Sequence, residues 1–102
     1  MRFLVKVTIP LEAGNELVRD PKFGKRVQEI LDDIKAEDVY FTVYGGQRTI
    51  FLVVNLSDAS RIPALVEPLW LALKANVDLI PAMSQKEFAK AAAHVERAAK
   101  KY

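Results

Sequence analysis

Two adjacent glycines between two β-rich segments constrain the fold of this chain more than any other feature. Residues 39–44 and 47–55 are rich in β-branched and aromatic side chains, and Gly45-Gly46 alone separates them. A two-residue hairpin turn needs positive φ angles, which glycine adopts without steric cost, so the pattern predicts an antiparallel hairpin. Such a turn also fixes the register, so that Tyr44 pairs with Gln47 and the pairing continues in step along both strands.

The register decides which side chains share a face, because successive side chains of a strand point to opposite sides. One face is apolar and must receive the helices; it collects Val39, Phe41, Val43, Ile50, Leu52 and Val54, joined by Phe3, Val5, Val7 and Ile9. The other face is amphipathic; it collects Tyr40, Thr42, Tyr44, Gln47, Thr49, Phe51 and Val53, with Leu4, Lys6 and Thr8 beside them.

Apolar spacing predicts the first half of the remaining elements. Residues 2–9 alternate as a strand that Pro10 closes, and we expect a loop around Gly14 and Asn15.

A helix should follow that loop. Asp20 is its expected N-cap and Pro21 its first helical residue. The apolar stripe runs over residues 23–34, and the helix should end near Ala36.

The second half of the chain predicts two more helices around a strand. Asp58 or Ser60 should cap a helix with a kink at Pro68, and its apolar stripe consists of Ile62, Leu65, Val66, Leu69 and Leu73. Residues 75–82 should form a short edge strand.

Ser84 and Glu87 form a capping-box pattern for a terminal helix that reaches about Lys101. The resulting order, β-α-β-β-α-β plus a C-terminal helix, predicts an α+β, ferredoxin-like fold with a four-stranded antiparallel sheet. Its length of 102 residues fits one domain, residues 1–102.

Composition narrows the chemistry. The chain has 51% apolar and 27% charged residues, which is typical of a soluble globular protein. With no cysteine, disulfides, thiolate metal sites, thiol nucleophiles and iron–sulfur clusters are excluded. No leader-like apolar segment opens the sequence, so we expect a cytoplasmic protein with no membrane association. The net charge of +2 comes from the terminal helix, and a charge this low makes nucleic acid an improbable partner.

The amphipathic sheet face needs a cover. The terminal helix could cross it, but its apolar stripe of Phe88, Ala92, Val95 and Ala99 is narrow. We expect a second copy of the chain to cover this face instead, because symmetric dimers are the commonest oligomers. We therefore expect a homodimer that associates through the sheet.

These features resemble the dimeric α+β barrel superfamily, in which two ferredoxin-like subunits pack sheet to sheet. The order of elements, the Gly45-Gly46 hairpin and the terminal helix carry the likeness, together with Pro10, Gly14-Asn15, Glu67-Pro68 and Pro81-Ala82-Met83. The chain is most similar to an uncharacterised bacterial branch; distant relatives include muconolactone isomerase and antibiotic-biosynthesis monooxygenases. The resemblance implies the fold and the dimer, and no catalytic residue, metal or cofactor is carried over.

Two charged residues are candidates for a ligand site. Arg48 falls on the apolar face opposite Val43, where a cation must reach the rim, pair with a carboxylate, or hold an anionic group of a ligand at a pocket mouth. Glu67, beside Pro68, is its candidate partner or a solvated side chain.

Aromatic residues supply the other candidates. Trp70 lies off the helix stripe and could line an apolar cavity or pack on the terminal helix or another subunit, while Tyr40 and Phe51 lie on the amphipathic face. His94, the single histidine, lies on the solvent side of the terminal helix.

Three functions remain open from the sequence. The first is a homodimeric barrel that binds a small apolar or aromatic molecule, with a cofactor-independent oxygenase or isomerase as its enzymatic form. The second is a non-catalytic assembly or regulatory protein. The third is an RNA-binding module, which the spacing of aromatics over residues 45–52 disfavours.

Overall fold

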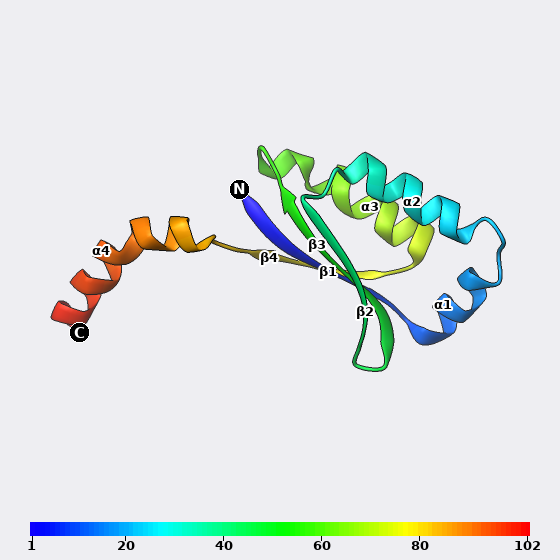
Figure 1. The fold of residues 1–102 in the computed structure, drawn as a ribbon, viewed down its shortest axis with the longest axis horizontal. Coiled ribbons are helices and arrows are strands. Elements are labelled where there is room, and N and C mark those ends of the chain that lie inside the picture. The colour runs from blue at the N-terminus through cyan, green and yellow to red at the C-terminus, as the bar shows by residue number, and fades with distance from the viewer.

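Four strands form a single antiparallel sheet in the order β2-β3-β1-β4 (Figure 1). They are β1 (Arg2–Ile9), β2 (Asp38–Tyr44), β3 (Gln47–Asn55) and β4 (Asn76–Pro81). The computed structural model describes residues 1–102. The molecule is thus a mixed α/β domain with four strands and four α-helices.

The hairpin prediction is confirmed. Gly45 and Gly46 have φ angles of 59° and 76°, and Tyr44 pairs with Gln47 as the two-residue turn requires. The pairing continues without a slip to Asp38 opposite Val53. The predicted edge strand is also confirmed, since β4 pairs with β1 alone.

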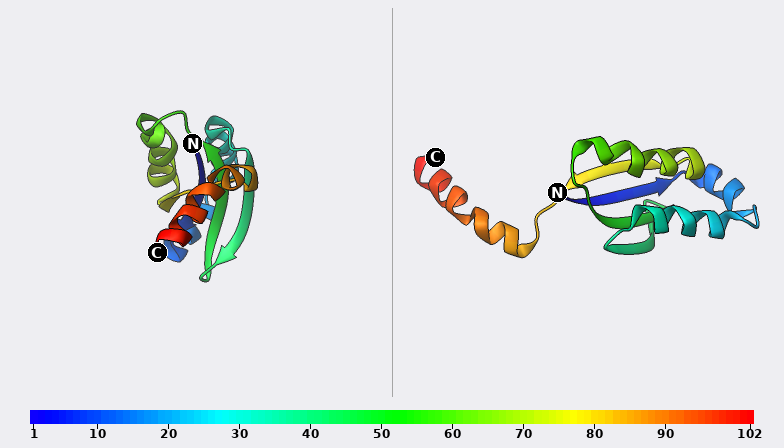
Figure 2. Two further views of the ribbon diagram at one scale, coloured as in Figure 1. Left: turned by 90° about the vertical axis from the view of Figure 1, so that its left-hand side faces the viewer. Right: turned by 90° about the horizontal axis from the view of Figure 1, so that it is seen from above.

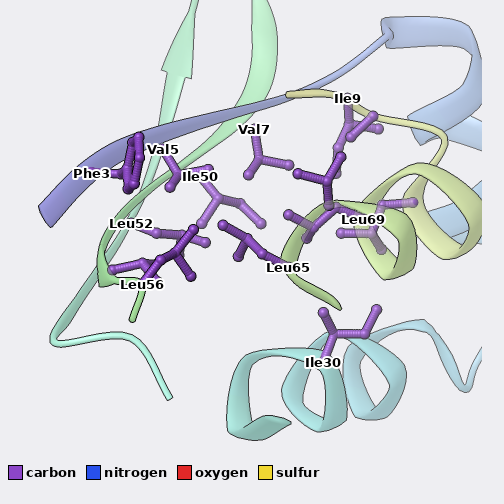
Figure 3. Close-up of a cluster of buried hydrophobic side chains, with 14 residues drawn as sticks. Phe3, Val5, Val7, Ile9, Ile30, Ile50, Leu52, Leu56, Leu65 and Leu69 are labelled. Atoms are coloured by element: carbon purple, nitrogen blue, oxygen red, sulfur yellow. The ribbon is translucent and has the colours of Figure 1, made fainter. Parts of the chain in front are cut away.

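Helices α2 (Phe23–Ile34) and α3 (Ile62–Leu73) lie on one side of the sheet, and we call that side the covered face (Figure 2). Apolar side chains of β1, β3 and α3 pack there into one core (Figure 3). Its members include Val5, Val7, Leu52, Leu69 and Leu73, each 1% exposed or less. The alternation read from the sequence therefore assigned the core residues of β1 and β3 correctly.

The segment between β1 and α2 differs from the expected loop. Residues around Gly14 and Asn15 form a helix, α1 (Leu11–Val18), whose first turn includes the hydrogen bond from the Gly14 N–H to the Pro10 carbonyl at 2.8 Å. Glycine and asparagine weaken a helix by only about 1 kcal/mol or less, and the partly buried Leu17 packs on the core and offsets that cost.

The start and end of α2 also differ from the prediction. The Asp20 carboxylate accepts a hydrogen bond from the Lys22 backbone N–H at 2.9 Å, which closes a turn before the helix instead of capping it. The helix begins at Phe23 and ends at Ile34, because Lys35 adopts a left-handed conformation with φ of 55°.

Asp58 caps the 3₁₀ helix η1 (Ala59–Arg61) by accepting from the Ser60 backbone N–H, and α3 follows directly. No helix is long and apolar enough to span a membrane.

The terminal helix α4 (Gln85–Lys101) stands away from the rest of the molecule (Figures 1 and 2). Its predicted capping box is present, with Ser84 and Glu87 bonded reciprocally. None of its residues is buried, and the molecule measures 58 × 28 × 19 Å. Its radius of gyration of 16.9 Å exceeds the about 13 Å of a compact chain of this length. We call α4 the arm.

The position of the arm corrects one interpretation of α3. The sequence predicts that apolar residues on the outer side of α3 pack on the terminal helix or on another subunit. They do not pack on the terminal helix of the same chain. Trp70 is 49% and Leu71 77% exposed.

The arm also leaves the second side of the sheet uncovered; we call it the bare face. Its side chains come from all four strands: Leu4, Lys6, Thr8, Tyr40, Thr42, Tyr44, Gln47, Thr49, Phe51, Val53, Asp78 and Ile80.

Candidate ligand-binding site

The helices do not cover the whole of the covered face, and the gap they leave is an apolar pocket. Phe41 and Val43 of β2 were expected to lie beneath the helices, but they are 65% and 73% exposed. Helix α2 is only half-buried, with Ile30 its single buried residue, so it stands off from the hairpin end of the sheet.

The pocket has a volume of about 240 Å³. It is bounded by the ends of β1 and α1, by α2 and by the hairpin; its lining residues are Ile9, Val18, Phe23, Val27, Phe41, Thr42, Arg48, Thr49 and Ile50. Six of these nine residues are hydrophobic, and Arg48 is the only charged one. A mostly apolar concavity with a few polar groups is the usual form of a small-molecule site, although this one is smaller than most.

Arg48 reaches the pocket from the second residue of β3, where it lies between Ile9 on β1 and Val43 on β2. The prediction that it lies on the apolar face is confirmed by this register. Its side chain is partly buried, and its Nη1 donates a hydrogen bond to Asn15 Oδ1 at 3.0 Å.

Glu67 is not the partner of Arg48. It lies exposed on α3, and no carboxylate approaches Arg48 within 4.0 Å. The partner is a neutral amide on α1, a helix that the sequence did not reveal.

Gly14 lets the arginine lie against α1. A Cβ atom at this position would be 2.9 Å from Arg48 Nη1 and 3.2 Å from Ile9 Cγ2. Gly14 is buried, so a side chain here would displace the guanidinium from its present place. The backbone of α1 and the Asn15 amide therefore fix where the positive charge sits.

The other predicted site residues do not join this pocket. Tyr40 and Phe51 are cross-strand neighbours on the bare face. The Phe51 ring packs edge-on against the Tyr44 ring at 6.0 Å between centroids, and Lys6 Nζ lies 3.9 Å from the Tyr44 ring centre.

Trp70 lines no pocket and lies on the outer side of α3, and His94 is exposed on the arm. Of the five candidates, Arg48 alone lies at a cavity.

The bare face is ordered in rows across the strands. Ile80, Leu4 and Val53 form an apolar row from β4 to β3. In the next row Asp78, Lys6, Phe51 and Tyr40 follow one another across all four strands. Tyr40, Leu4 and Ile80 are 61%, 44% and 47% exposed, respectively, so much of this apolar surface faces solvent.

Two carboxyl groups have perturbed acidities, and both lie outside the pocket. The Ser60 hydroxyl donates to Asp58 and lowers the pKa of that carboxyl. The Ser84 backbone N–H donates to Glu87 and lowers its pKa, with further contributions from the Ser84 side chain and from Arg2. Both carboxylates accept hydrogen bonds at the start of a helix, η1 or α4, where a negative charge is favourable.

Sequence reasoning missed the pocket residues Val18, Phe23 and Val27 and the support from Gly14 and Asn15. One signal could have found part of them: a cation on an apolar face demands a polar partner, and Glu12 and Asn15 are the first two polar side chains after the end of β1.

No group of three or more His, Asp or Glu side chains gathers in a way that could hold a metal ion. No family model matches this chain, and no curated protein matches it.

Proposed function

We propose that this chain is the subunit of a homodimeric α+β barrel that binds a small, largely apolar molecule in the pocket beside Arg48. In this proposal β1, α2, β2, β3, α3 and β4 form a ferredoxin-like core, to which α1 and the arm are additions. Two copies pack bare face to bare face. The exposed apolar surface of the bare face is the observation that carries the proposal.

The total exposed surface of the chain supports association. The chain exposes 7298 Å², whereas a compact monomer of 11.5 kDa exposes about 5,800 Å². The excess of about 1,500 Å² belongs to the whole extended chain, arm included, and is larger than the about 800 Å² that each partner buries in a stable interface. The exposed apolar rows of the bare face are the part of that surface that is typical of an interaction site.

The charges of the bare face suit a second copy. Lys6 and Asp78 are cross-strand neighbours within one chain. In a twofold interface each patch meets a copy of itself, so Lys6 of one copy can approach Asp78 of the other. The arm adds a further apolar stripe, with Phe88 and Val95 52% and 56% exposed, that the same partner would cover.

The pocket favours ligand binding over assembly alone. A protein whose purpose is only to dimerise needs no apolar cavity at the end of its core, and the cavity of about 240 Å³ lies at the predicted residue Arg48. The resemblance to the dimeric α+β barrel superfamily extends the proposal to turnover, as an oxygenase or isomerase that needs no cofactor. The exposed arm favours a second candidate, a non-catalytic assembly protein.

Sedimentation equilibrium tests the dimer. We expect a dimer at micromolar concentration and at least a tenfold weaker association in Leu4→Lys, because the lysine would be buried against an apolar row. Leu11→Lys is the matched control: Leu11 is 53% exposed and lies on α1, which is not part of the bare face. A monomeric protein at these concentrations, or equal effects of the two substitutions, would overturn the proposal.

A further inference from the structure

Arg48 carries a charge that the protein itself does not neutralise. A guanidinium has five N–H donors, and the one hydrogen bond that Arg48 donates within the chain goes to a neutral amide oxygen of Asn15. Aspartate has nearly the same shape as asparagine and would have formed a stronger, charge-assisted pair. With asparagine at this position, the positive charge held against α1 beside the pocket keeps its capacity for an anion.

The position of the guanidinium is fixed before any ligand arrives. Gly14 allows it to lie against α1, and the Asn15 amide holds Nη1 at 3.0 Å. A preorganised charge loses less freedom when it binds a ligand, so more of the interaction contributes to affinity.

The rest of the pocket sets the character of the molecule. The rest of the lining is mainly aromatic and aliphatic, with Phe23 and Val27 contributed by α2 and Phe41 by β2. A volume of about 240 Å³ suits a compact body without further charges. A second negative charge would find no second cation, because Arg48 is the only charged residue in the lining.

We infer that the pocket takes a small apolar monocarboxylate, whose carboxylate pairs with Arg48 and whose hydrocarbon or aromatic body lies between α2 and the hairpin. This inference rests on the proposed small-molecule function and adds the chemical class of the ligand to it. Asn15 and Gly14 act as positioning residues, because they place the guanidinium and do not contact the ligand's body.

Two probes with the same number of carbon atoms, one anionic and one neutral, test the inference. Octanoate and octan-1-ol both have eight carbon atoms, and only octanoate can form an ion pair with Arg48. Calorimetric titration of the full-length protein should give at least about tenfold tighter binding for octanoate, since a charge-assisted hydrogen bond contributes about 1.5–3 kcal/mol.

Two substitutions should remove that preference. Arg48→Gln deletes the charge, and Asn15→Asp keeps the arginine but supplies an internal carboxylate in nearly the same shape. In both variants octanoate should bind no more than about twofold more tightly than octan-1-ol. Thermal unfolding of each variant identifies any loss of folding, and Asn15→Asp retains every pocket-lining residue.

The outcomes separate the two proposals. If octan-1-ol binds as tightly as octanoate in the unmodified protein, the carboxylate class is wrong and the apolar ligand site stands. The same conclusion follows if Asn15→Asp keeps the full preference for octanoate. If neither probe binds, the small-molecule function is wrong and the inference falls with it.

Discussion

The two faces of the sheet share the same strands and the same hydrogen bonds, yet they differ in what covers them. On the covered face Val5, Val7 and Leu52 are 1% exposed or less, whereas on the bare face Leu4 and Tyr40 are 44% and 61% exposed. The register makes one face apolar except for Arg48 and the other amphipathic. Which face is buried then depends on which helices pack onto the sheet. Here α2 and α3 cover one face, and α4 packs on neither.

The difference teaches that local pattern and tertiary cover are separate determinants of burial. Both faces carry large apolar side chains, so composition alone does not distinguish them. The contrast suggests that one face stabilises the monomer while the other is available for association, and the predictions below test this division.

The largest expected effect is on the free energy of unfolding, and a matched pair of leucine truncations, one on each face, should reveal it. Leu52→Ala removes a buried side chain and should lower the free energy of unfolding by about 2–5 kcal/mol at every protein concentration. Leu4→Ala should cost little in dilute solution and more as concentration rises if the proposed dimer forms, because only a second copy would then cover Leu4. Urea unfolding at several protein concentrations measures both.

Equal, concentration-independent losses in the two variants would break the comparison, since Leu4 would then stabilise the monomer in the same way as Leu52.

The sequence predicted the features that depend on residues a few positions apart and missed those that depend on tertiary packing. The hairpin register, the two faces and the capping box of the arm were predicted because each depends on residues within a few positions. Helix α1 was missed because Gly14 and Asn15 are turn-forming residues locally, and the packing of α1 on the core outweighs that preference.

For the site, the sequence placed Arg48 on the correct face but named Glu67 as its candidate partner. The true partner, Asn15, is 33 positions away on the missed helix. The pocket itself depends on the separation of α2 from β2. That separation results from tertiary packing, and the spacing of apolar residues in the sequence does not predict it.

A second prediction asks whether the arm belongs to the same association surface as the bare face. Ala92→Glu places a carboxylate on the apolar stripe with Phe88 and Val95, and Ala93→Glu makes the same change about 100° around the helix. We expect at least about tenfold weaker dimerisation for Ala92→Glu, through burial of a charge, and less than about twofold change for Ala93→Glu.

Helix propensity is altered equally in the two variants, so a difference in sedimentation reports contact and not helix stability. Identical behaviour of the two variants would show that the arm takes no part in the interface.

The smallest effect concerns how the arm is held at its first turn, and it depends on pH. Glu87 accepts from the Ser84 backbone N–H and pairs with Arg2, so its carboxylate links the start of α4 to β1. Its pKa is lowered, and a carboxyl group with a lowered pKa contributes stability above its ordinary pKa and loses it as the pH falls through the lowered value.

The backbone N–H signals of Ser84 and Glu87 should therefore lose protection from hydrogen exchange only below about pH 4, the ordinary range of a glutamate. Glu87→Gln should weaken protection at neutral pH, since it removes the ion pair with Arg2, and should flatten the dependence on acid. Asp58→Asn is the control, because Asp58 also has a lowered pKa but caps η1, far from the arm in the chain. If Asp58→Asn changes the acid dependence of the Ser84 signal as much as Glu87→Gln does, loss of protection reports global unfolding. The contact of Glu87 with Arg2 on β1 would then not be what holds the arm away from the bare face.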